Sequence, residues 1–110
     1  MQSKIDGHTT ILSPTGRLDQ STVETFQGAV RAIIEGPSPN LVLDLAKVEF
    51  VSSVGLRALV MINSQAKKDG RKFALAAPSQ VVKEVLAIAR LNTVIPSFAT
   101  VDEATKAQRA

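Results

Sequence analysis

Two adjacent serines, Ser52 and Ser53, are the residues whose type and position best suit a chemical role. They stand between an apolar run and a stretch, from about Val54 to Lys68, that predicts a helix. A serine at the start of a helix commonly accepts a hydrogen bond from a free backbone N–H, which is worth about 1 kcal/mol. The same N–H groups and the positive end of the helix dipole also suit a phosphate or a partner protein. Because one serine is enough to cap the helix, the other leaves a spare hydroxyl.

Most of the other groups needed for catalysis are missing from the sequence. A serine nucleophile needs a base, and the only histidine, His8, lies in an N-terminal segment that we expect to be irregular. No Gly-x-Ser-x-Gly elbow, GxxxxGK[ST] loop or GxGxxG loop is present. Asp19, Asp44 and Glu49 at predicted strand ends would allow a magnesium site if they met, although isolated acids in loops usually cap helices or face water. We therefore expect no enzymatic activity and no cofactor or metal.

The composition is that of one small domain. A chain of 110 residues can build a single core, and the absence of cysteine excludes disulfides and thiolate metal sites. The net charge of +3 is spread along the chain and no Tyr or Trp is present, so we expect no nucleic-acid binding. No apolar run approaches the roughly 20 residues that cross a bilayer, and the N-terminus has no signal region. We expect a cytoplasmic protein that does not insert into membranes and that is a monomer.

The first part of the chain predicts a lead-in, a strand and a helix. We expect residues 1–8 to be a flexible lead-in and residues 9–108 to form the domain. Residues 9–18 favour a strand or hairpin at a sheet edge, since Pro14 cannot donate a backbone hydrogen bond. Ser21 and Glu24 fit a capping box at the start of the next helix. The buried face of that helix is predicted to contain Val23, Phe26, Val30, Ile33 and Ile34.

The rest of the chain predicts a central strand followed by alternating helices and strands. Consecutive apolar residues over 41–45 indicate a strand buried on both faces, and a short connector over 46–51 follows. In the next helix, we expect Leu56, Leu59, Val60 and Ala66 to face the sheet. We expect Arg57, Asn63, Gln65, Lys67 and Lys68 to face solvent, and interpret Lys67, Lys68, Arg71 and Lys72 as a solvated helix end. A strand over 72–76, a helix after Ser79, a short strand before residue 98 and a helix over 101–108 complete an α/β pattern.

The centre of the sequence resembles the signature of the STAS domain of bacterial anti-sigma factor antagonists, over LVLDLAKVEFVSSVGLRALV. That signature is an apolar strand ending in Asp, a connector, and Asp-Ser-Ser/Ala-Gly-Leu opening a helix. Gly16-Arg17-Leu18-Asp19 resembles the segment before the first helix of the family, and the likeness covers roughly residues 9–107. It implies a single small α/β domain with a mixed four- to five-stranded sheet and helices packed mainly on one side.

The resemblance also implies a function. Members of this family bind, when unphosphorylated, an anti-sigma factor that is a GHKL-type serine kinase, and so release a sigma factor. The kinase ends the interaction by phosphorylating the serine before the helix, and a PP2C-type phosphatase restores it. By this resemblance the phosphoacceptor corresponds to Ser53. Ser52 stands where the family usually has an acid before the acceptor, so a second hydroxyl is present and Ser52 is the alternative acceptor. A second possibility is a STAS adaptor subunit that is not phosphorylated, in a phospholipid-transport ATPase complex or a stress-signalling scaffold.

A partner-binding surface is expected around the serines. It would contain Asp19, Gln20, Ser52, Ser53, Val54, Arg57 and Met61. The last three are spaced at i, i+3 and i+7 and so share one side of the predicted helix. In the alternative interpretation, Val54 and Met61 pack at the sheet margin and Arg57 is merely solvated. Asp44 is expected to be structural and to order the connector through backbone N–H groups.

Overall fold

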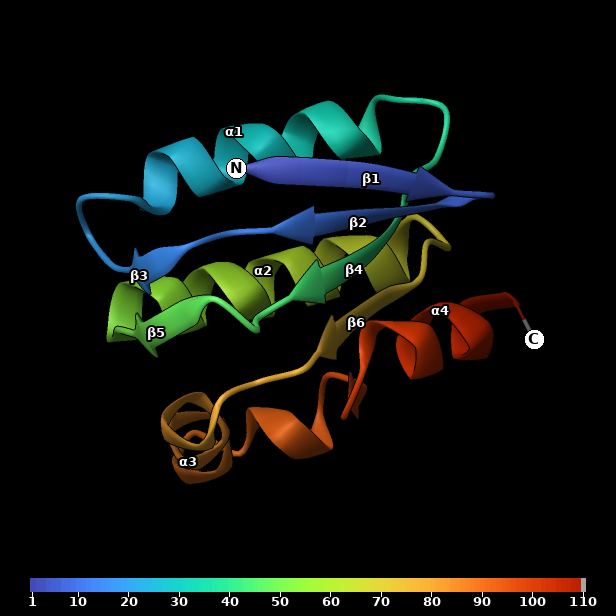
Figure 1. Cartoon of the computed structure of the whole chain (residues 1–110). Coiled ribbons are helices and arrows are strands. Elements are labelled where there is room, and N and C mark those ends of the chain that lie inside the picture. Colours follow the sequence, from blue (N-terminus) through green and yellow to red (C-terminus); the bar gives the residue numbers. More distant parts are fainter. Residues whose placement is uncertain (110) are drawn as a thin grey trace.

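Strand β4 (Asn40–Asp44) is the centre of the fold. A computed structural model describes residues 1–109 (Figure 1). In it, β4 lies between β2 (Thr9–Ser13) and β6 (Phe73–Ala76) and pairs in parallel with both. Strand β1 (Gln2–Asp6), antiparallel to β2, and strand β7 (Ser97–Phe98), parallel to β6, complete a mixed sheet in the order β1-β2-β4-β6-β7. The predicted α/β class with a mixed sheet is confirmed.

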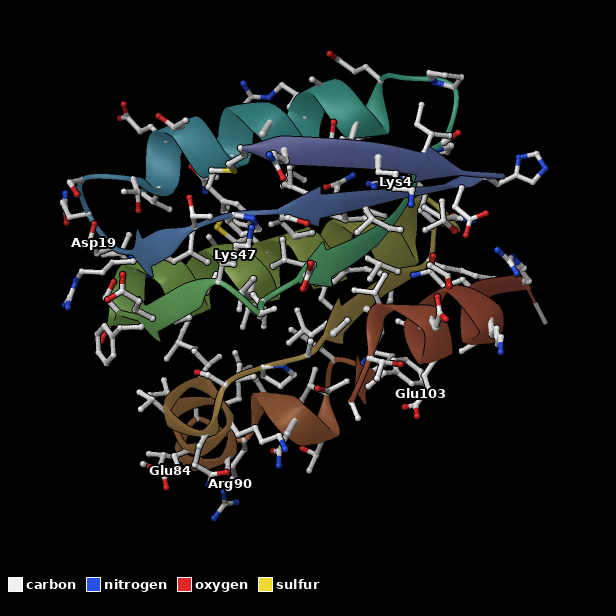
Figure 2. All side chains as sticks on the ribbon, in the orientation of Figure 1. Lys4, Asp19, Lys47, Glu84, Arg90 and Glu103 are labelled. Atoms are coloured by element: carbon white, nitrogen blue, oxygen red, sulfur yellow. The ribbon has the colours of Figure 1, made fainter. Side chains whose placement is uncertain are left out.

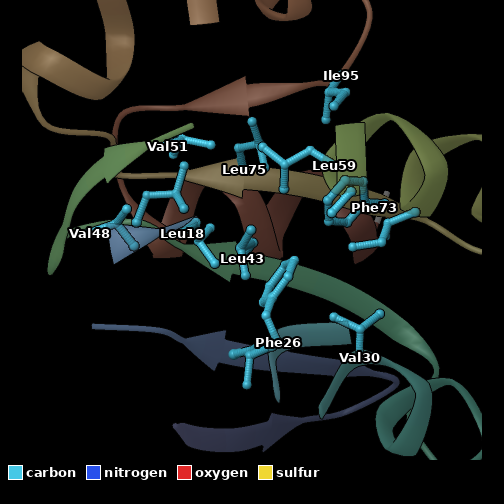
Figure 3. Packing of buried hydrophobic residues seen from close by; sticks show 14 of the residues in the cluster. Leu18, Phe26, Val30, Leu43, Val48, Val51, Leu59, Phe73, Leu75 and Ile95 are labelled. Atoms are coloured by element: carbon cyan, nitrogen blue, oxygen red, sulfur yellow. The ribbon is translucent and has the colours of Figure 1, made fainter. Parts of the chain in front are cut away.

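Different helices cover the two faces of this sheet. Helices α1 (Val23–Ile34) and α2 (Ser53–Lys68) lie behind the sheet in Figure 1, and their buried residues form one core cluster that includes Leu43 of β4. Figure 3 shows members of this cluster that come from both helices and from the sheet. Val42 belongs to a smaller cluster, which includes residues of helix α4 (Val101–Arg109). Neighbouring side chains of β4 thus point to opposite faces, and its three central residues, 41–43, are all buried, as predicted for a central strand.

A second sheet of two strands carries the serines. Strand β3 (Gly16–Leu18) pairs in parallel with strand β5 (Val48–Val51). The prediction of a connector over residues 46–51 is therefore wrong in part, because residues 48–51 form strand β5. Gly16 has a φ of +83° beside a register shift, and so acts as a bulge residue. Helix α3 (Gln80–Ile88) packs on β5, and a short 3-10 turn (Leu91–Thr93) leads from it to β7.

The N-terminal expectations are corrected at two points. Residues 1–8 are not an irregular lead-in, since they contain β1, which pairs with β2 from Gln2 opposite Ser13 to Asp6 opposite Thr9. Four of the five β1 residues are exposed, so the strand has no apolar alternation by which the sequence could reveal it. Because β1 covers β2, β2 is an interior strand and not an edge strand. Pro14 does not interrupt it, because the proline lies between β2 and β3.

The helix expectations are partly corrected. In helix α1, Val23, Phe26 and Val30 of the predicted face are buried, whereas Ile33 and Ile34 are half-buried. The N-cap is Thr22, without a side-chain capping bond, and no capping box forms at Ser21. In α2 the positions of Val60 and Asn63 are the reverse of those expected, since Val60 is 40% exposed and Asn63 only 5%. The helix instead packs through small residues, including Gly55 and Ala58, which allow a close approach to the sheet. The later strands and helices occur where predicted.

Candidate functional site

The ends of β3 and β5 bring the two halves of the predicted surface together. Leu18 lies opposite Val51 in the parallel register, and the backbone N–H of Ser52 donates to the carbonyl oxygen of Leu18 at 2.9 Å. Asp19 follows Leu18, so the loop that leads to α1 lies beside the start of α2. Figure 2 shows Asp19 at the end of β3, where α2 begins. The loop that begins at Asp19 and the two serines, which the sequence assigned to one surface, therefore lie close together.

Helix α2 approaches β3 so closely that only glycine fits at position 55. A Cβ added at Gly55 would lie 2.7 Å from the carbonyl oxygen of Leu18 and 2.8 Å from Cγ1 of Val51. Both separations are shorter than an ordinary van der Waals contact, and a backbone carbonyl cannot rotate away. Any side chain at this position would push the start of α2 away from the two strands. Gly55 thereby fixes the serines relative to the Asp19 loop.

The two serines have different structural roles. Ser52 is the N-cap of α2, with extended backbone angles, and its Oγ accepts a long hydrogen bond of 3.4 Å from the N–H of Gly55. Ser53 is the first residue of the helix, and its side chain is exposed. Within residues 1–109, the Ser53 hydroxyl forms no hydrogen bond. One serine therefore caps the helix and the other presents an unused hydroxyl to solvent.

The Asp19 carboxylate is held by its own loop. Its Oδ1 accepts hydrogen bonds from the hydroxyl of Ser21 at 2.7 Å and from the backbone N–H of Ser21 at 3.0 Å. Its Oδ2 accepts from Nε of Arg17 at 3.4 Å. The Ser21 hydroxyl, more than any other group, holds the pKa of Asp19 below its usual range, although partial desolvation opposes this. A fixed negative charge therefore stands beside the start of α2, and the neighbouring Gln20 is exposed.

Arg17 and Phe50 form a pair beside the serines that the sequence analysis did not place in the site. They face each other across β3 and β5, and the guanidinium carbon of Arg17 lies 5.0 Å from the centre of the Phe50 ring. Such a cation–π contact stabilises an exposed pair by about 0.5–1 kcal/mol. The only sequence signal would have been the alternation of apolar and polar residues over 48–51. That signal is visible only if the connector is interpreted as a strand.

The predicted side of α2 is accessible over most of its length. Arg57 and Met61 are exposed, whereas Val54 is half-buried and packs against the core. Met61 therefore does not pack at the sheet margin, but Val54 partly does. A shallow groove of about 480 Å³ between α1 and α2 is lined in part by Met61 and Gln65. The exposed surface around Ser53 thus continues along α2 into this groove.

Asp44 has the predicted structural role. Its Oδ1 accepts a hydrogen bond from the backbone N–H of Ala46 at 3.1 Å, and its Oδ2 accepts one from the Ser13 hydroxyl at 3.1 Å. These bonds order the turn after β4. Within the described part of the chain, no three Asp, Glu or His side chains are gathered in a way that could hold a metal ion. No helix in residues 1–109 is long and apolar enough to cross a bilayer.

Comparison with known proteins places the chain in a family. The sequence model of the STAS domain family matches residues 1–104. The chain belongs to the STAS domain family. This STAS domain is 29% identical over 96 residues to the anti-sigma-F factor antagonist RsfB of Mycobacterium tuberculosis, a match that covers 86% of this chain and 76% of RsfB.

Solved structures agree with the assignment. An anti-sigma factor antagonist from Mycobacterium paratuberculosis has a TM-score of 0.89 and 27% identity, over 99% of this chain and 92% of that chain. The anti-sigma factor antagonist SpoIIAA in its unphosphorylated form has a TM-score of 0.80, over 98% of this chain and 95% of that chain. At 22% identity, the likeness to SpoIIAA concerns the fold alone. The family suggested by the central sequence pattern is confirmed.

Proposed function

We propose that this STAS domain is an anti-sigma factor antagonist that a kinase switches off by phosphorylating Ser53. In its unphosphorylated form it binds an anti-sigma factor with GHKL-type serine kinase activity, and so releases a sigma factor. A PP2C-type phosphatase restores the binding form. The observation that carries the proposal is the exposed Ser53 hydroxyl at the first residue of α2, left free because Ser52 caps the helix. The similarity to RsfB and to the mycobacterial structure supports the class of partner.

The geometry favours Ser53 over Ser52 as the phosphoacceptor. The Ser52 hydroxyl is half-buried and accepts the capping hydrogen bond, so its modification would disturb the start of α2. Ser53 is exposed, and a phosphate there adds about −1.5 to −2 charges at the positive end of the helix. Arg57 stands four residues further along α2, a spacing that allows a phosphate on Ser53 to pair with its guanidinium. The folded state should therefore tolerate the modification.

The proposed switch acts on binding and not on folding. A phosphate on Ser53 would lie between the Asp19 loop and the exposed side of α2, in the centre of the partner-binding surface. The carboxylate of Asp19 would add a like charge on the same surface. Removing a phosphate from water in an interface costs several kcal/mol even where Arg57 pairs with it, and that pairing would also take Arg57 from the partner. Phosphorylation would therefore end the interaction by charge and bulk.

The test is phosphorylation by the anti-sigma factor kinase encoded nearest to the gene, with ATP. We expect the intact mass to increase by one phosphate and the modified residue to be Ser53. Ser53→Ala should abolish the mass increase. Ser52→Ala is the matched control and should still be modified, although with a less well capped helix. Modification of Ser52 alone, or of neither serine, would contradict the proposal.

A second candidate function is that of a STAS adaptor subunit in a larger assembly, without phosphorylation. It is favoured by apolar side chains exposed on α3 and the turn after it, namely Val81, Ile88 and Val94. Ile88 is 83% exposed, which is unusual for an isoleucine. If these residues join the domain to an assembly, Ile88→Lys should abolish incorporation and Ser53→Asp should not. An antagonist would show the opposite pattern when binding to the anti-sigma factor is measured.

A further inference from the structure

A cavity of about 270 Å³ opens at the end of α2 opposite to Ser53. It is lined by residues of the last turns of α2, of strands β6 and β7, and of helix α4. Of the α2 residues that line the cavity, Asn63 is the one nearest to Ser53 in sequence. Ten residues separate the two, a distance of about 15 Å along the helix axis. The cavity is thus separate from the proposed phosphorylation site, and a molecule bound in it would leave Ser53 uncovered.

Two polar side chains of low exposure line this cavity, and within residues 1–109 each has a polar group without a hydrogen-bond partner, although only Nε of Arg71 is itself fully buried. Asn63 is only 5% exposed, and its side-chain amide forms no hydrogen bond within residues 1–109. The Arg71 side chain is 9% exposed and its Nη2 donates to Asp69 at 2.8 Å, but in the described part of the chain its Nε has no acceptor. The expectation that Arg71 belongs to a solvated helix end is therefore wrong. A buried polar group without a partner is costly, so the cavity wall offers donors that a ligand can satisfy.

The charge of the cavity has one sign. Lys67, Arg71 and Lys72 contribute to its lining, and no acid is among the described lining residues. Asp69, outside the lining, pairs with Arg71 and offsets its charge. Nζ of Lys72 donates to the backbone carbonyl of Gln108 at 2.6 Å, so we assign that side chain no contact with a ligand. Lys67 is exposed at the mouth and Arg71 lies within the wall. Lys67 therefore gives the mouth of the cavity a positive charge, which favours an anion.

The remaining wall is apolar. It contains Phe73 of β6 and Phe98 of β7, together with Ala66 of α2. An inorganic anion would leave these surfaces in contact with water, whereas a hydrocarbon group would cover them. The volume is slightly below the usual range of about 300–1,000 Å³ for ligand pockets, so only a small molecule fits.

We propose that this cavity binds a small organic carboxylate with a short hydrocarbon body. The carboxylate accepts hydrogen bonds from the Asn63 amide and from Nε of Arg71, and lies near the positive charge of Lys67. The hydrocarbon body packs on Phe73 and Phe98. The site does not depend on the proposed role of Ser53, and either assignment can fail while the other stands.

The test is a titration of the full chain with hexanoate, followed by NMR of the ¹⁵N-labelled protein. We expect saturable shifts of the Asn63 side-chain amide and of backbone amides in β7 and α4, with little change at Ser53. Acetate lacks the hydrocarbon body and 1-hexanol lacks the charge, so each should bind at least about tenfold more weakly. Equal binding of either control compound, or no saturable shift with hexanoate, would overturn the proposal.

Two variants locate the binding. Ala107 lines the cavity but is exposed on α4, so Ala107→Phe should fill the space without disturbing the core. Asn63→Leu keeps the size of the side chain and removes the amide. Both should weaken hexanoate binding by about tenfold or more, and Ser53→Ala, as the matched control, should not. Undiminished binding to a folded Ala107→Phe variant would show that hexanoate binds elsewhere and would overturn the assignment.

Discussion

Replacing Gly55 by alanine should destabilise the domain, although alanine is the better helix former. The added Cβ would lie 2.7 Å from the carbonyl oxygen of Leu18, and ordinary contact begins at 3.4 Å, so α2 must move by about 0.7 Å. Overpacking of this kind costs about 1–3 kcal/mol, and the higher helix propensity of alanine returns about 1 kcal/mol. From the middle of the first range we expect a net loss of about 1 kcal/mol, which lowers Tm by roughly 4–8 °C in a domain of this size.

Thermal and urea unfolding followed by circular dichroism would measure the effect. Gly28 provides the matched control, because it is exposed within α1 and an added Cβ would meet nothing within 4 Å. Gly28→Ala should therefore stabilise the domain by about 0.5–1 kcal/mol. If Gly55→Ala is as stable as the native protein, the close approach of α2 to β3 does not fix the serines and this reasoning is refuted.

Four further changes have expected outcomes. Ser53→Asp should weaken binding of the anti-sigma factor by at least about tenfold in calorimetry, with Tm nearly unchanged because an acid suits a helix N-terminus; unaltered affinity would count against the switch. Arg57→Glu should slow association with an acidic partner in stopped-flow measurements, and an association rate that does not change at low salt would remove Arg57 from the interface. Asp19→Asn should destabilise the domain at neutral pH. The folded state lowers the pKa of Asp19, so the ionised carboxylate contributes to the free energy of unfolding above the usual carboxyl pKa. That contribution is lost as the pH falls from about 5, so the acid unfolding curves of the two proteins should converge. Gln108→Ala should lower the free energy of unfolding in urea by about 1–3 kcal/mol, since Nε2 of Gln108 donates to the buried carbonyl of Leu41 at 2.9 Å. Lys106→Ala, at an exposed position of α4, is the control. A smaller loss for Gln108→Ala than for the control would show that this bond does not hold α4.

The centre of the fold could be predicted from the sequence because its signal is local. The apolar run over 41–45 identifies the central strand, and the serines mark the start of α2. The spare hydroxyl could be anticipated in the same way, since one helix start needs only one capping side chain. These features depend on residues that are adjacent in the chain.

The missed features depend on contacts between distant segments. Strand β1 has mostly exposed side chains and is held by backbone pairing with β2, which composition does not reveal. The burial of Asn63 in place of Val60 follows from the direction in which α2 lies on the sheet. The need for glycine at position 55 follows from a carbonyl group 37 positions earlier in the chain, at Leu18. No periodicity within a single element contains this information.

The most direct test of the account is the affinity of the anti-sigma factor for this STAS domain before and after phosphorylation. Isothermal titration calorimetry should detect binding to the unphosphorylated protein and a loss of at least about tenfold in affinity once Ser53 carries a phosphate. Treatment with a PP2C-type phosphatase should restore the original affinity. Equal affinity of the two forms would contradict the central claim, because the exposed hydroxyl at the start of α2 would then have no part in partner binding.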